Sequence, residues 1–127
     1  MSGNELLKID ASSGSIDIPG LIHQYVVTSY SVDGAIAISP GIAELAKTSA
    51  AVMTIAAPTT AQDGTIITIL NSTAYAHVVT FTGGTLVNGT SAAKTTATFP
   101  ANVGGSIRII ARGGKWYLNG YTSVTLA

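Results

Sequence analysis

The chain has 127 residues, no cysteine, and six basic residues that balance six acidic ones. A domain of this size can bury a core without disulfide or metal cross-links. The lack of cysteine excludes a disulfide framework and a cysteine-based zinc site. Only 9% of the residues are charged, against about 25% in ordinary soluble domains. This balance predicts no nucleic-acid partner, which needs clustered lysine and arginine, and no membrane partner, because no basic amphipathic helix is visible.

Residues 1–24 carry apolar side chains without a helical or an alternating period, around Ser/Gly and Pro19-Gly20 turn signals. This pattern predicts an extended N-terminal arm that another surface orders; a frayed tail followed by one ordinary strand is the alternative. The start has neither the basic residues nor the apolar run of a secretory signal, so we expect assembly in the cytoplasm. The apolar residues expected to bind that surface are Leu6, Leu7, Ile9, Ile16 and Ile18.

Residues 25–127 consist of short β-branched runs separated by Gly, Pro, Asn and Asp, which predicts an all-β domain. The close spacing favours a single antiparallel β-sandwich or a barrel-like domain. Residues 42–47 have helix-favouring composition, but we predict a strand there as well. The expected strands are Tyr25–Tyr30, Ala35–Ser39, Ile42–Ala46, Ala51–Ala56, Thr65–Leu70, His77–Thr82, Thr85–Val87, Thr95–Phe99, Ser106–Arg112, Lys115–Asn119 and Thr122–Leu126.

Two glycine pairs predict tight hairpin turns, because glycine readily adopts the positive φ that such turns require. Gly113-Gly114 sets Ala111 opposite Trp116 and Arg112 opposite Lys115, a like-charge pair that needs solvent or an acidic partner, with solvent favoured. Gly83-Gly84 similarly sets Phe81 opposite Leu86. Residues 65–70 are apolar on both sides, which is typical of a strand between two packed layers.

No group of side chains in the sequence predicts catalysis or cofactor binding. His23 and His77 lack the spacing of metal ligands, so a surface or hydrogen-bonded role is favoured for each. Asp33-Gly34 and Asp63-Gly64 are typical of turns, and the other acids are widely spread. The G-x-S-x-G motif, the nucleophile elbow of many serine hydrolases, is also absent from the sequence. We therefore predict no enzyme, no metal and no cofactor.

Several strings, taken together and in order, are characteristic of a known module. They are Thr54-Ile55-Ala56-Ala57-Pro58, Asp63 to Ile69, Ala76-His77-Val78-Val79-Thr80, Gly104-Gly105-Ser106-Ile107, Gly114-Lys115-Trp116-Tyr117 and Val124-Thr125-Leu126. From about residue 30 onward the chain resembles a β-rich module of tailed-phage structural proteins, notably head decoration (cement) proteins and some fibre tips. It departs from that pattern at Pro100 and at Gly105, where an acidic turn residue is expected. The resemblance implies a homotrimer on the exterior of the capsid, with the major capsid protein as its partner.

The sequence-based hypothesis is therefore a structural virion protein that decorates and stabilises a tailed-phage capsid. The low charge leaves surface that partner chains would cover, which favours an oligomer. A fibre tip or a carbohydrate- or receptor-binding module is the alternative, and an enzyme is disfavoured. Tyrosine buries area while keeping a polar tip, so the candidate oligomer-interface residues, for which a core position is an equal alternative, are Tyr25, Tyr30, Tyr117 and Tyr121.

Overall fold

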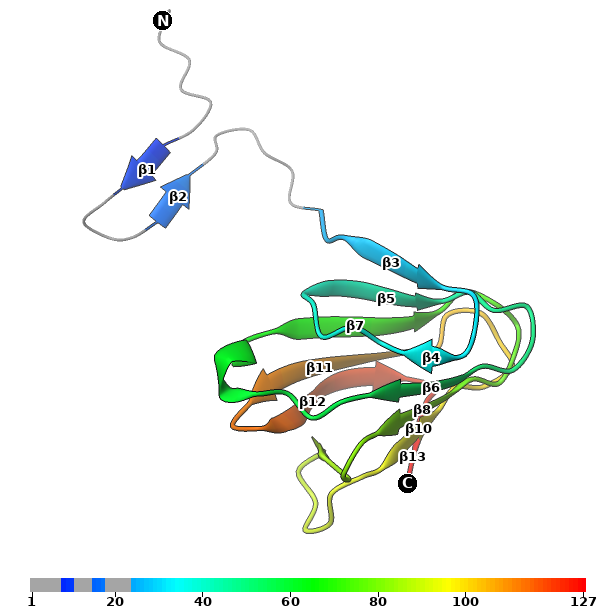
Figure 1. Cartoon of the computed structure of the whole chain (residues 1–127). Coiled ribbons are helices and arrows are strands. Elements are labelled where there is room, and N and C mark those ends of the chain that lie inside the picture. The colour runs from blue at the N-terminus through cyan, green and yellow to red at the C-terminus, as the bar shows by residue number, and fades with distance from the viewer. Residues whose placement is uncertain (1–7, 11–14, 18–23) are drawn as a thin grey trace, which may run out of the picture.

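A computed structural model describes residues 8–10, 15–17 and 24–127, and within residues 24–127 two β-sheets pack face to face (Figure 1). The six-stranded sheet has the order β3 (Val27–Tyr30), β5 (Gly41–Leu45), β7 (Ile66–Asn71), β11 (Ser106–Arg112), β12 (Lys115–Thr122) and β9 (Leu86–Val87). The five-stranded sheet has the order β13 (Thr125–Leu126), β10 (Thr96–Thr98), β8 (Val78–Phe81), β6 (Val52–Ile55) and β4 (Gly34–Ala35). The prediction of an all-β fold is confirmed, and each expected strand overlaps an observed one, including the strand at residues 42–46.

The chain alternates between the two sheets from β3 to β8, so strands that follow each other in sequence lie in different layers (Figure 1). As a result β3, β5 and β7 run parallel in one sheet, and β4, β6 and β8 run parallel in the other. Antiparallel pairs follow in β10 to β13. The predicted purely antiparallel arrangement is therefore wrong, and so is the barrel, because both sheets are open and mixed.

The core lies between the sheets and is formed by alternate residues of each strand. Trp116 on β12 is completely buried, and its indole Nε1 donates a 2.9 Å hydrogen bond to the carbonyl oxygen of Ala56, just after β6. Both sheets contribute large side chains, which lets a two-layer fold exclude water from its centre. The largest fully buried apolar residues are Trp116, Phe81, Phe99, Leu45, Met53, Ile55, Ile67, Ile69, Leu86, Ile107 and Ile109.

The β11–β12 hairpin has the predicted register, with Ala111 opposite Trp116 and Arg112 opposite Lys115. A register shift follows between Ile107 and Ile109, beyond the part that the turn specifies. Solvent is not the only compensation for the like charges at the tip, because Asp63 accepts a 3.1 Å hydrogen bond from the Arg112 guanidinium. Asp63 also accepts from the Gly113 backbone N–H, so its carboxylate joins two distant loops.

The hairpin predicted at Gly83-Gly84 is wrong. Both glycines have positive φ and form a tight turn, but the chain then crosses to the other sheet. Leu86 becomes the parallel partner of Trp116 instead of the antiparallel partner of Phe81. Burial explains this path, because Leu86 and Phe81 are both completely buried and fill the core from opposite layers.

Loops at one end of the two layers are joined by two buried polar residues, Asn71 and His77. The Asn71 side-chain amide donates to three backbone carbonyl oxygens, those of Tyr75, Pro100 and Asn102. His77 Nδ1 accepts a 2.9 Å hydrogen bond from the Ala51 N–H, which fixes that nitrogen as unprotonated. These bonds satisfy the buried polar groups, as a stable interior requires.

The N-terminal part of the chain is described only as a two-stranded antiparallel pair, β1 (Lys8–Asp10) with β2 (Ser15–Asp17). Among the described residues the one helix is a 3-10 turn, η1 (Thr60–Gln62), and none is long and apolar enough to cross a membrane.

Candidate interaction surface

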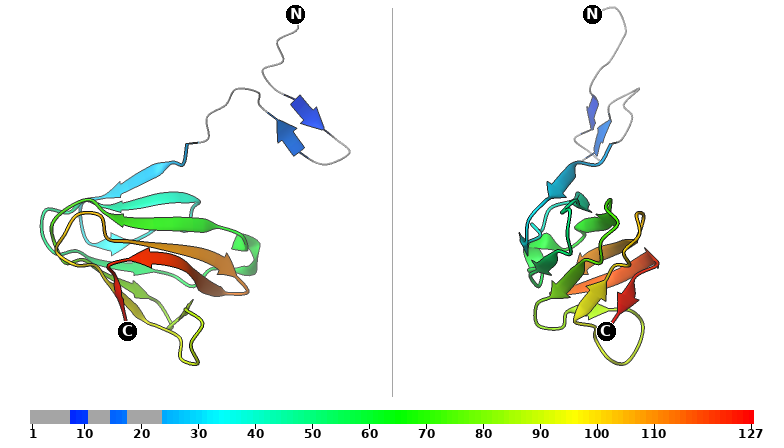
Figure 2. Two further views of the ribbon diagram at one scale, coloured as in Figure 1. Left: turned by 180° about the vertical axis from the view of Figure 1, so that it is seen from behind. Right: turned by 90° about the vertical axis from the view of Figure 1, so that its right-hand side faces the viewer.

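The side of the six-stranded sheet that points away from the core carries an unusual number of apolar residues for a solvent-facing surface. On β7, Ile67 and Ile69 point into the core, while Ile66 and Leu70 point outward and are half-buried. The sequence predicted this double-sided strand to lie between two layers, but among the described residues no third layer covers it. We call this side the outer face of the six-stranded sheet; the left view of Figure 2 looks onto it.

Direct strand pairing aligns the outward apolar residues in a row across four strands. Ile66 on β7 is opposite Ile110 on β11, which is opposite Tyr117 on β12, which is opposite Val87 on β9. A second pair, Val27 with Ile42, extends the apolar surface to the β3 edge. Directly paired side chains on one face of a sheet are neighbours, so the row from Ile66 to Val87 forms a continuous apolar strip, while the direct partner of Ile42 on β7 is Thr68.

Charged residues of both signs lie on the same face. Glu44 points outward from β5 and is half-buried, while Arg108 on β11 and Lys115 on β12 are exposed. Within residues 24–127 the ion pairs are Lys47 with Asp33 and Arg112 with Asp63, so none of these three charges has an ion-pair partner among the described residues. The acid lies toward one side of the face and the bases toward the other.

The outer face of the five-stranded sheet has a different composition. Two rows cross it, and threonine makes up five of their eight residues. Threonine methyl and hydroxyl groups suit a strand that meets water, whereas rows of isoleucine and tyrosine do not. The residues of these rows are Ala35, Thr54, Thr80 and Thr96, and then Val52, Val78, Thr98 and Thr125.

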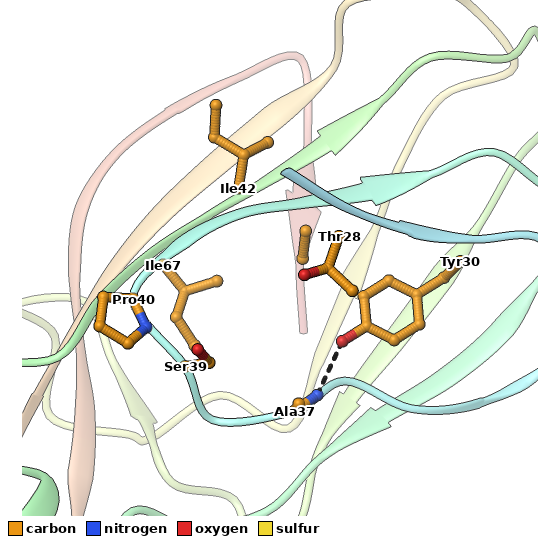
Figure 3. A pocket seen from close by; sticks show the side chains of 8 residues that line it. Thr28, Tyr30, Ala37, Ser39, Pro40, Ile42 and Ile67 are labelled. Atoms are coloured by element: carbon orange, nitrogen blue, oxygen red, sulfur yellow. Dashed lines mark hydrogen bonds between the residues drawn. The ribbon is translucent and has the colours of Figure 1, made fainter. Parts of the chain in front are cut away.

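The four tyrosines predicted at an interface divide into two groups. Tyr25, Tyr117 and Tyr121 are exposed, with 70%, 48% and 57% of their surface accessible. Tyr30 is half-buried against the core, and its hydroxyl accepts a 2.9 Å hydrogen bond from the Ala37 N–H (Figure 3). The structure thus brings Tyr25 and Tyr117 to the outer face of the six-stranded sheet and places Tyr30 between the layers.

Two shallow hollows flank the β3 edge. The outer one is open to solvent, spans about 220 Å³ and is lined by Tyr25, Gly41, Ile66, Thr68 and Arg108. The inner one, of about 230 Å³, opens between β3 and the loop before β5; Figure 3 shows Thr28, Tyr30, Ser39, Pro40 and Ile67 around it. Both are small compared with the sites that hold most small-molecule ligands, so they suit single side chains of a partner.

The candidate arm residues are only in part within the described structure. Leu6, Leu7 and Ile18 lie outside the described residues. For Ile9 and Ile16 the backbone register is described, and it pairs them directly. A two-stranded sheet on its own is marginally stable in water, so a stable β1–β2 pair would need another surface to pack on.

Two clusters of polar groups, one around Asp33 and one around His77, join loops of the β-domain through hydrogen bonds. Hydrogen bonds from Lys47 and from the Val52 N–H lower the pKa of Asp33 below its ordinary value. Burial, with a smaller effect from Lys47, lowers the pKa of His77, which favours its neutral form. Neither group lines one of the two hollows, and no three potential metal-ligating side chains gather within residues 24–127.

Sequence reasoning placed Arg108 on the outward side of its hairpin but did not connect it with Glu44, because their common face depends on the pairing of β5 and of β11 with β7, strands far apart in the sequence. Comparison with known proteins adds no relative: no family model matches the chain, and no curated protein matches it.

Proposed function

We propose that the protein is a structural virion protein that decorates and stabilises the outer surface of a tailed-phage capsid. In this proposal the β-domain associates into a homotrimer, and the N-terminal arm contacts the major capsid protein. Assembly takes place in the host cytoplasm, and the mature location is the capsid exterior.

The observation that carries this proposal is the apolar outer face of the six-stranded sheet. Isolated monomers rarely expose continuous apolar surface of this kind, so a role in assembly explains the face better than a role in solution does. The order of the strand and turn motifs resembles that of phage head decoration modules, and this resemblance is the reason for proposing the major capsid protein as the partner.

The fibre-tip alternative is less well supported. Carbohydrate- or receptor-binding tips use exposed aromatic rings beside acids and amides, and the one tryptophan of the chain is completely buried. Of the exposed tyrosines, Tyr25 and Tyr117 lie on the apolar face rather than around a polar pocket. No specific contact in the structure favours this function over association with other protein chains.

The test is co-sedimentation with undecorated heads of the phage that encodes this chain. We expect the full chain to pellet with the heads, and a chain lacking residues 1–24 to fold but remain in the supernatant. Retained binding would place the capsid contact on the β-domain, and loss of folding would make the arm part of the core. A triple variant in the full chain, Leu6→Ser with Ile9→Ser and Ile16→Ser, tests the arm without truncation. Binding to purified tails rather than heads would contradict the proposal.

A further inference from the structure

We propose that the outer face of the six-stranded sheet is where copies of this chain pack on one another, with Glu44 of one copy paired with Arg108 of the next. This inference rests on the self-association included in the proposed function, but not on capsid binding. It assigns the interface to a particular face and adds a charge pair that sets how the copies are oriented.

The apolar rows define the centre of this interface. Ile66, Ile110 and Tyr117 are direct neighbours in the middle of the face, and all three retain accessible surface in the single chain. The cores of homo-oligomer interfaces are more apolar than ordinary protein surface, and tyrosine is enriched there. The threonine-rich face of the five-stranded sheet lacks such a centre, which leaves it as the solvent side.

The charges select a second copy as the occupant. Glu44 and Arg108 lie on β5 and β11, with β7 between them, so their strands are about 10 Å apart. No ion pair joins them among the described contacts. In a cyclic trimer whose three faces point toward a common axis, the acidic side of one face lies beside the basic side of the next, so one face supplies both partners. Such a closed ring repeats the same head-to-tail contact between each copy and the next.

The same charges explain how the wrong orientation is avoided. In the reverse orientation Arg108 and Lys115 of the two copies would approach each other, and like charges at an interface oppose binding. Apolar rows alone would allow several registers. The separated acid and base therefore give orientation, while the isoleucines and tyrosines give affinity.

The experiment compares four full-length chains by sedimentation equilibrium: the parent, Glu44→Arg, Arg108→Glu and the double variant. Each single variant places like charges in contact, and we expect its dissociation constant to rise at least roughly tenfold. The double variant restores opposite charges with the direction reversed, and we expect it to recover most of the affinity. Thr54→Arg, on the outer face of the five-stranded sheet, is the control and should associate like the parent.

Thermal unfolding checks that each variant is folded. If a reversal unfolds the chain, Glu44→Gln and Arg108→Gln replace it, and both should weaken association and reduce its dependence on salt. Unchanged association in the single variants, or a double variant no better than either single, would overturn the inference. If the chain's own arm covered this face, association would be unchanged in the single variants. Capsid co-sedimentation is scored separately, so loss of head binding with intact charge-swap behaviour would contradict only the proposed function.

Discussion

The Trp116 indole and the Ala56 carbonyl join the two sheets through one 2.9 Å hydrogen bond at the edge of the core. Trp116 is also the bulkiest completely buried side chain. We expect Trp116→Ala to lower the free energy of unfolding by about 3–5 kcal/mol, the usual cost of deleting a large buried aromatic. Trp116→Phe keeps most of the volume and loses the hydrogen bond, so it should cost less. Urea unfolding measures both, and an unchanged midpoint for Trp116→Ala would contradict the described packing.

His77 makes stability depend on pH in a definite direction. Its pKa is lowered in the folded chain, while the unfolded chain titrates near the ordinary value of about 6.5. The unfolded state therefore binds the proton first, and stability falls as pH drops below about 6.5, with a slope of at most about 1.4 kcal/mol per pH unit. We expect urea midpoints to decrease from pH 7.5 to pH 5.5. His77→Gln should be less stable at pH 7.5 but should lose most of this decrease; the same slope in both chains would assign the effect elsewhere.

Asn71 is expected to tolerate no acid at its position. Its amide nitrogen faces three carbonyl oxygens, so Asn71→Asp would bring a carboxylate against them. We expect a loss of about 3 kcal/mol or more at pH 7. That carboxyl would have a raised pKa, so the loss should shrink at acidic pH, opposite in sign to the effect of His77.

The matched control for this substitution is Asn88→Asp. The described hydrogen bonds of the Asn88 side chain are accepted by its oxygen, from Thr90, and a carboxylate can keep them. Thermal unfolding should show a small change for Asn88→Asp and a large one for Asn71→Asp. Equal effects at the two sites would mean that the three carbonyl contacts do not matter.

The close approach of β3 to β5 depends on the glycine at position 41. A Cβ there would collide with the Val26 carbonyl oxygen, which accepts a hydrogen bond from the Ile42 N–H. Gly41→Ala should therefore destabilise the chain by about 1–3 kcal/mol and speed amide exchange at Ile42. Gly64→Ala, at a φ of +88° against +130° for Gly41, has open space around the added carbon, so it measures the cost of a positive φ without a collision. Exchange at Ile42 that stays as slow as in the parent would refute the contact.

The sequence predicted the fold where the signal was local. A two-residue glycine loop sets the β11–β12 register, because neighbours in sequence are then neighbours in the sheet. The parallel pairs carry no such signal. Gly41 on β5 pairs with Ile67 on β7, although β6, which lies between them in the sequence, belongs to the other sheet. Leu86 shows the same limit. The turn before Leu86 was predicted correctly. Its strand partner, Trp116, follows from the place in the core that the Leu86 side chain fills.

The candidate surface was predictable only in outline. The two-sided apolar pattern of β7 and the outward position of Tyr117 could be read from alternation. The common face of Glu44 and Arg108 could not, because it requires the order β5–β7–β11. Asn71 carried no recognisable signal, since its role depends on three carbonyl groups from loops that meet only in the folded chain.

The most direct test of the proposed function is cryo-electron microscopy of virions, with and without the gene for this chain. We predict regular knobs on the capsid exterior that disappear with the gene, and that carry the label when the chain is tagged. Label confined to the tail tip, or capsids identical in both preparations, would contradict the account.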